Sequence, residues 1–79
     1  MEIEKIREIL AKNGRLSTPV EQLAVDGDLY NAGLTSLATV GVMLALEEEF
    51  NIEIPDSLLG RKTFQSIQSI ADVVNQLKS

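Results

Sequence analysis

Apolar residues recur at the helical period near both ends of this chain. In the first segment, MEIEKIREILAK, they are Ile3, Ile6, Ile9 and Leu10. In the last segment they are Phe64, Ile67, Ile70, Ala71, Val74 and Leu77. A helix places residues with this spacing on one face, which can then be buried. We therefore predict a helix near each end, and we expect Thr63 to cap the second one.

A third helix is predicted from Ser36 to about Phe50. Its expected buried residues are Leu37, Val40, Met43, Leu44 and Phe50. Two short helical turns are also expected, one at STPVEQLA with Thr18 as its cap and one from Pro55 to Leu59. The stretch NIEIP follows the third helix. It is too short for a strand and lacks a partner strand, so it predicts an extended connector into Pro55. The fold class is therefore all-α, a small helical bundle of three main helices plus short turns.

Length and composition narrow the functional classes. With 79 residues the chain forms one domain, covering 1–79. It contains neither cysteine nor histidine, so the usual thiol nucleophile, general base and transition-metal ligands are missing. We expect no catalytic residue and no metal site. No apolar run approaches the ~20 residues that cross a bilayer, which predicts a cytoplasmic protein without membrane contact.

Charge is unevenly distributed along the chain. The net charge is −5, and the segment from Leu16 to Gly60 holds eight acidic residues and no basic one. Such an anionic surface repels nucleic acid and attracts partners with basic docking patches. An acidic surface that only keeps the protein soluble is the alternative. Arg61 and Lys62 are interpreted as ordinary surface charges.

The stretch AGLTSLATV places two hydroxyl residues at the start of the central helix. Thr35 is the better cap, since Ser36 then becomes the first helical residue and its side chain can point to solvent. A phosphate ester on Ser36 would lie at the positive end of the helix, which favours anions by about 0.3 to 1 kcal/mol. The pattern thus fits a plain helix cap and also a modification site.

Leu29 to Asp56, LYNAGLTSLATVGVMLALEEEFNIEIPD, resembles the centre of the acyl carrier protein family. The shared features are a G-[LA]-x-S-[LF] core, a helix ending in clustered glutamates and an I-P-[DE] turn. The resemblance implies that a phosphopantetheinyl transferase moves a 4'-phosphopantetheine arm from coenzyme A onto Ser36. The thiol of this arm would hold an acyl group as a thioester, and the chain would present it to partner enzymes without being an enzyme itself.

Some positions depart from the family pattern. Thr35 stands where the family usually has Asp, and Ala38 and Gly41 stand where fatty-acid carriers tend to have acidic docking residues. Three stretches, IREILAKNGRLSTPVEQLA, AGLTSLATV and LLGRKTFQSI, are similar to small stand-alone carriers loaded by amino-acid ligases. The alternatives to an acyl carrier are therefore an aminoacyl carrier and a helical interaction module without a prosthetic group.

The resemblance also implies roles for residues around Ser36. Partner enzymes would recognise Leu37 together with Glu47, Glu48 and Glu49, through apolar contact and electrostatic steering. A cavity for an apolar cargo would be bordered by Ile54, Leu58 and Leu59, although core packing explains each of them equally well. We expect a monomer, since no surface stripe is predicted to be apolar enough to require a dimer.

Overall fold

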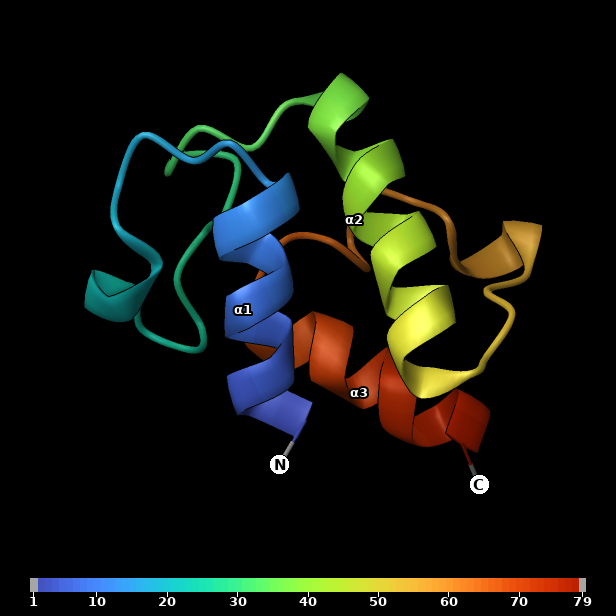
Figure 1. Ribbon diagram of the computed structural model, residues 1–79. Helices are drawn as coiled ribbons and strands as arrows, with labels where there is room; N and C mark the ends of the chain where they lie inside the picture. Colours follow the sequence, from blue (N-terminus) through green and yellow to red (C-terminus); the bar gives the residue numbers. More distant parts are fainter. Residues whose placement is uncertain (1, 79) are drawn as a thin grey trace.

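The structure, a computed structural model, describes residues 2–78 and is helical throughout its ordered elements (Figure 1). The three main helices are α1 (Glu2–Asn13), α2 (Ser36–Phe50) and α3 (Ile67–Lys78). Two 3₁₀ turns lie between them, η1 (Val20–Gln22) and η2 (Asp56–Leu58). No strand occurs in this part of the chain, so the predicted all-α bundle is confirmed and NIEIP is an extended connector.

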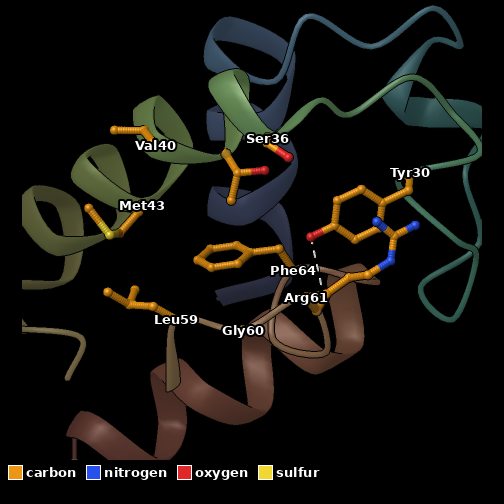
Figure 2. A pocket seen from close by; sticks show the side chains of 9 residues that line it. Tyr30, Ser36, Val40, Met43, Leu59, Gly60, Arg61 and Phe64 are labelled. Carbon is orange, nitrogen blue, oxygen red and sulfur yellow. Dashed lines mark hydrogen bonds between the residues drawn. The ribbon is translucent and has the colours of Figure 1, made fainter. Parts of the chain in front are cut away.

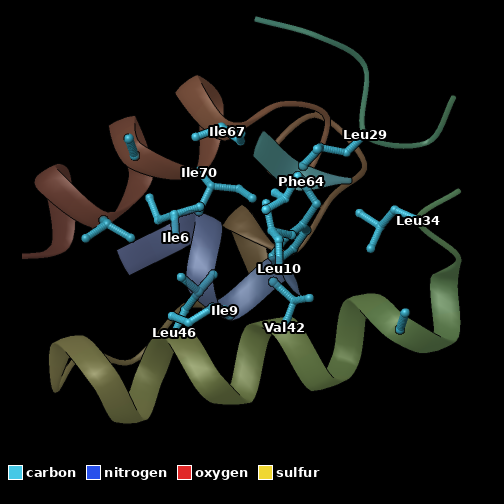
Figure 3. Close-up of a cluster of buried hydrophobic side chains, with 14 of the residues drawn as sticks. Ile6, Ile9, Leu10, Leu29, Leu34, Val42, Leu46, Phe64, Ile67 and Ile70 are labelled. Carbon is cyan, nitrogen blue, oxygen red and sulfur yellow. The ribbon is translucent and has the colours of Figure 1, made fainter. Parts of the chain in front are cut away.

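The core lies where α1 meets the other two helices. α1 packs against both α2 and α3, which contact each other less extensively. Side chains from all three helices and from the loops fill this space (Figure 3). Those of Ile6, Leu10, Leu29, Leu46, Phe64, Ile67 and Ile70 are almost completely buried. The two terminal stripes predicted from the sequence therefore face each other across one core.

The buried face of α2 differs from the predicted one. Its buried residues are Ala38, Val42 and Leu46. Three residues expected inside are exposed instead: Leu37 by 84%, Val40 by 51% and Leu44 by 55%. α2 is apolar around most of its circumference, so periodicity alone could not identify the inner face. These three side chains form an exposed apolar stripe along α2.

α3 begins three residues later than predicted, because Ser66 rather than Thr63 caps it. The Ser66 Oγ accepts a hydrogen bond from the Ser69 N–H at 3.0 Å, and the Ser69 Oγ accepts one from the Ser66 N–H at 3.0 Å. These reciprocal bonds satisfy two helix-terminal N–H groups. Thr63 is buried in the preceding turn, where its carbonyl accepts a bond from the Ser69 hydroxyl at 3.0 Å.

The long connection between α1 and α2 is held by polar contacts. Thr18 does not act as the expected cap, since η1 has no side-chain cap and starts after Pro19. Instead, the Arg7 guanidinium donates hydrogen bonds to the carbonyls of Val20, at 2.6 Å, and Leu23, at 3.0 Å. η1 is thereby fastened to α1 by a residue that sequence patterns did not single out.

Candidate functional site

Ser36 is the first residue of α2, and its side chain is exposed. The preceding Thr35 has an extended backbone, and its Oγ1 accepts a hydrogen bond from the Ala38 N–H at 3.1 Å. The Thr39 hydroxyl donates a second bond, of 2.8 Å, to the Thr35 carbonyl. Thr35 is thus the N-cap. Its side chain and its carbonyl both bond to residues of the first helical turn, which fixes the turn that carries the Ser36 hydroxyl.

The loop that leads into this turn requires a glycine at position 33. Gly33 has a φ of 111°, and a Cβ there would lie 2.9 Å from the Ser17 backbone nitrogen. The Ser17 N–H donates to the neighbouring Ala32 carbonyl at 2.8 Å, so the two loop segments touch at this point. The glycine of the AGLTS motif therefore sets the path by which the chain enters α2.

A groove of about 420 Å³ lies directly beside Ser36 (Figure 2). One wall comes from α2, and the other from Tyr30 and the segment that follows η2. Its apolar lining includes Val40, Met43, Leu59 and Phe64. An open groove with such walls can take a slender, largely uncharged chain that starts at the serine.

Tyr30 and Arg61 form the polar end of the groove. The Arg61 guanidinium carbon lies 3.9 Å from the centre of the Tyr30 ring, and the Tyr30 hydroxyl donates to the Arg61 carbonyl at 3.4 Å. Figure 2 shows the two side chains stacked across from Ser36. The sequence predicts only an ordinary surface charge at Arg61, because no local pattern pairs it with Tyr30. Among the described lining residues it carries the only charge.

The three glutamates at the end of α2 have separate environments. The Glu47 carboxylate accepts a hydrogen bond from the Ile54 N–H at 2.9 Å, and Glu49 lies 3.8 Å from the Lys5 ammonium. Glu48 is exposed and lines a polar cleft between α1 and α2. Of the three predicted recognition glutamates, Glu48 and Glu49 are therefore exposed, and Glu47 is half-buried and bonded to Ile54.

The residues predicted to border a cargo cavity are also not found together. Leu59 lines the groove beside Ser36. Ile54 belongs to the buried core, and Leu58 is half-buried against that core. The Ile54 backbone N–H donates to Glu47 on α2, and the Ile54 side chain is buried. For Ile54 and Leu58, core packing is the role that the structure shows.

Within residues 2–78, no group of three or more histidine, cysteine, aspartate or glutamate side chains could hold a metal ion. None of the helices in this range has the length and apolar character needed to span a membrane.

An exposed serine at a helix start, framed by a cap and opening onto an apolar groove, suits a long prosthetic arm joined through phosphate. The N–H groups of the first helical turn favour a negative charge at this end. Comparison with known families agrees: residues 4–76 match the family described as "Phosphopantetheine attachment site". The chain belongs to this family of carrier proteins, whose covalently attached phosphopantetheine holds an acyl group as a thioester.

Individual relatives show the same relationship. An aminoacyl carrier protein from Agrobacterium fabrum is 59% identical over 69 residues, covering 87% of this chain and 83% of the relative. An acyl carrier protein from Rickettsia bellii is 32% identical over 76 residues, covering 95% and 80%. Among solved structures, the carrier protein from Agrobacterium tumefaciens in complex with an engineered Bradyrhizobium japonicum glycine:[carrier protein] ligase and ATP superposes with a TM-score of 0.92. That match is 54% identical and covers 96% of this chain and 99% of the other.

Proposed function

We propose that Ser36 is the residue to which the 4'-phosphopantetheine arm is attached. The observation that carries this proposal is the exposed Ser36 hydroxyl on a first helical turn held by Thr35 and Thr39. The groove that begins at the same residue gives the arm a surface to lie on. Other exposed serines, such as Ser57 in η2, lack this combination of helix start and adjoining groove.

In the attachment reaction, the transferase supplies most of the catalytic groups. The Ser36 Oγ forms the new bond to phosphorus, the bond between that phosphorus and the departing adenosine bisphosphate breaks, and the hydroxyl proton must go to a base. The described groove lining contains no acidic side chain and no histidine, so this chain offers no base beside Ser36. The transferase therefore supplies the base, and the carrier supplies an accessible, well-oriented hydroxyl.

After attachment, the chain acts as a cosubstrate of other enzymes. The arm supplies the thiol that forms the thioester, which explains how a chain without cysteine can carry an acyl group. Partner enzymes recognise the exposed apolar stripe of α2, at Leu37, Val40 and Leu44, together with Glu48, one helical turn after Leu44. We propose a cytoplasmic monomer as the working form, to be tested by cell fractionation and by size-exclusion chromatography.

Intact-mass spectrometry tests the attachment site. The purified chain is incubated with coenzyme A and a broad-range phosphopantetheinyl transferase, and its mass is measured before and after. We expect the wild-type chain and a Ser57→Ala control to gain the mass of one phosphopantetheine, and Ser36→Ala to gain none. An unchanged wild-type mass, or a gain that persists in Ser36→Ala, would overturn the proposal.

We further propose an amino acid as the cargo, in preference to a fatty acyl chain. Support comes from the 59% identical aminoacyl carrier protein and from the related carrier protein solved with a glycine ligase. The structure is consistent with a small cargo, since the groove is open and Ile54 and Leu58 are packed into the core. Family membership argues against the third alternative, an interaction module without a prosthetic group.

Charging assays distinguish the two cargo classes. The phosphopantetheine-loaded chain is offered to a glycine:[carrier protein] ligase with ATP and glycine, and separately to an acyl carrier protein synthetase with ATP and a fatty acid. We expect faster charging by the ligase. Faster charging with the fatty acid would show that the cargo is a fatty acyl group. The proposal that Ser36 carries the arm would still stand.

A further inference from the structure

A second hollow, of about 470 Å³, lies between the C-terminal end of α1 and the first half of α2. Thr35 is part of its lining, so the hollow begins next to the proposed attachment site. We call it the basic hollow. Its lining also includes Lys12, Asn13, Arg15, Leu37 and Gly41.

The first unusual feature of the basic hollow is Gly41. This glycine lies in the interior of α2, where it destabilises the helix relative to alanine. Packing does not require it, because a Cβ at this position would come no closer than 4.0 Å, to Asn13. The missing side chain thus serves no contact within the described chain, and its effect is to leave the hollow open.

The second unusual feature is the backbone of Arg15, whose φ is 52°. Arginine seldom adopts this left-handed conformation, which favours glycine or asparagine. The other non-glycine residue with a positive φ in the described chain is Asn51, a type that tolerates it. Gly41 and Arg15 line the same hollow, and the left-handed Arg15 lies just after the end of α1, where helices commonly end in this conformation.

Charge and exposure indicate what the basic hollow accepts. Its only charged lining residues are Lys12 and Arg15, both exposed, and neither forms an ion pair within residues 2–78. The hollow thus has two cations on its wall, of which Lys12 also borders the polar cleft that holds Glu8, Glu48 and Glu49. The exposed Leu37 side chain on its wall adds an apolar contact. This combination suits a carboxylate that lies next to an apolar side chain.

We infer that the basic hollow is the docking site for the amino-acid ligase that charges the arm. The inference rests on the proposed function. The ligase would insert an apolar side chain over Gly41 and against Leu37, and would place a carboxylate between Lys12 and Arg15. Since the hollow and the groove lie on opposite sides of the turn formed by Thr35 and Ser36, docking in the hollow leaves the groove free.

Two variants alter the basic hollow without touching Ser36. Gly41→Leu fills it, and Arg15→Asn removes one cation while providing a residue that accepts the left-handed backbone. Their matched controls are Asn75→Leu, on an exposed part of α3, and Lys62→Asn, an exposed cation outside the hollow. Each chain is converted fully to the phosphopantetheine form, its Tm is recorded, and its KM and kcat with a glycine:[carrier protein] ligase are measured.

The expected result is a change in KM alone. KM rises about tenfold or more for Gly41→Leu and about threefold for Arg15→Asn. The KM of Arg15→Asn also depends less on salt concentration than that of the wild type. Both controls keep the wild-type KM, kcat is unchanged throughout, and neither variant has a lower Tm than the wild type.

Three other results would overturn the inference, and they are distinguishable. If fully loaded variants keep the wild-type KM, the ligase does not dock in the basic hollow, and the other proposals still stand. A wild-type chain that is loaded but not charged by the ligase defeats the docking site together with the amino-acid cargo. A wild-type chain that gains no phosphopantetheine at Ser36 defeats the proposed function itself.

Discussion

The Glu47 carboxylate accepts a hydrogen bond from the Ile54 backbone N–H at 2.9 Å, which ties the connector after α2 back onto the helix. This relationship gives a structural role to one of three acidic residues that looked equivalent in the sequence. It also accounts for a carboxylate near a helix C-terminus, where the helix dipole disfavours it.

Replacement of Glu47 should therefore destabilise the fold. Glu47→Ala removes a charge-assisted hydrogen bond and leaves the half-buried Ile54 N–H without its partner, so we expect a loss of about 1.5 to 3 kcal/mol. The exposed Glu48 provides the control, since Glu48→Ala should change stability by about 0.5 kcal/mol or less. Urea unfolding monitored by circular dichroism measures both. Equal effects of the two substitutions would show that the Glu47–Ile54 contact does not stabilise the fold.

The cap before Ser36 gives a second prediction. Thr35→Ala removes the acceptor for the Ala38 N–H and should lower the free energy of unfolding by about 1 kcal/mol. Thr35→Asp keeps an acceptor and adds a negative charge at the helix start, so it should be as stable as the wild type or slightly more so. Urea unfolding again provides the values. A Thr35→Asp chain as unstable as Thr35→Ala would contradict the role of the cap.

Helix capping also shows how far the sequence could predict the fold. The bounds of α2 could be predicted from Thr35 at one end and the connector NIEIP at the other, because both signals are local. At α3 three hydroxyl residues, Thr63, Ser66 and Ser69, compete for the cap. The choice of Ser66 accompanies contacts with a distant loop, where the Leu29 N–H donates to Gln65 and the Gln68 N–H donates to Val25. Such long-range constraints are not visible in a local pattern.

Arg7 should control the stability of the first long loop. One guanidinium nitrogen, Nη1, donates to two carbonyls of the η1 region, and a guanidinium loses less hydration than an ammonium at such a partly buried contact. We expect Arg7→Lys to lower the free energy of unfolding by about 1 to 2 kcal/mol. Lys5→Arg, an exposed cation on the same helix, serves as the control and should have almost no effect.

Hydrogen exchange locates the effect of Arg7→Lys. The Leu23 N–H, which bonds to the Val20 carbonyl, should exchange faster in this variant than in the wild type, while amides in α2 should change less. Unaltered exchange at Leu23 would mean that Arg7 does not hold η1.

The ends of α1 and α3 predict a small dependence of stability on pH. A hydrogen bond from its own backbone N–H, together with the Lys78 ammonium at 3.3 Å, lowers the pKa of Glu2 below its usual 4.5. A carboxylate whose pKa is lower in the folded state stabilises the fold above its unfolded pKa, and loses this contribution as the pH falls through the folded value.

Glu2→Gln should accordingly be less stable than the wild type at pH 7, and the difference should shrink once the pH falls below 4.5. Urea unfolding at a series of pH values measures this difference. In a Lys78→Gln background, the loss of stability that Glu2→Gln causes at pH 7 should be smaller, because one cause of the pKa shift is already removed. A difference that grows as the pH falls would contradict the assignment.

The functional site could be predicted only in part. The exposed Ser36 and its cap follow from a local motif, whereas the groove depends on Tyr30 and Arg61, which are brought together by the fold. The helical period predicts that Leu37, Val40 and Leu44 are buried, whereas the family resemblance implies an exposed Leu37. All three are exposed, because Ala38, Val42 and Leu46 face the core. Small residues such as Ala38 carry little weight in a periodicity argument.

Fragmentation mass spectrometry of the tryptic peptide that contains Ser36 tests the central claim most directly. Because no lysine or arginine lies between Arg15 and Arg61, trypsin releases one peptide, residues 16–61, that holds Ser17, Ser36 and Ser57. After incubation with coenzyme A and the transferase, we expect the added mass of phosphopantetheine on Ser36 alone. Added mass on Ser17 or Ser57, or an unmodified peptide, would contradict the account.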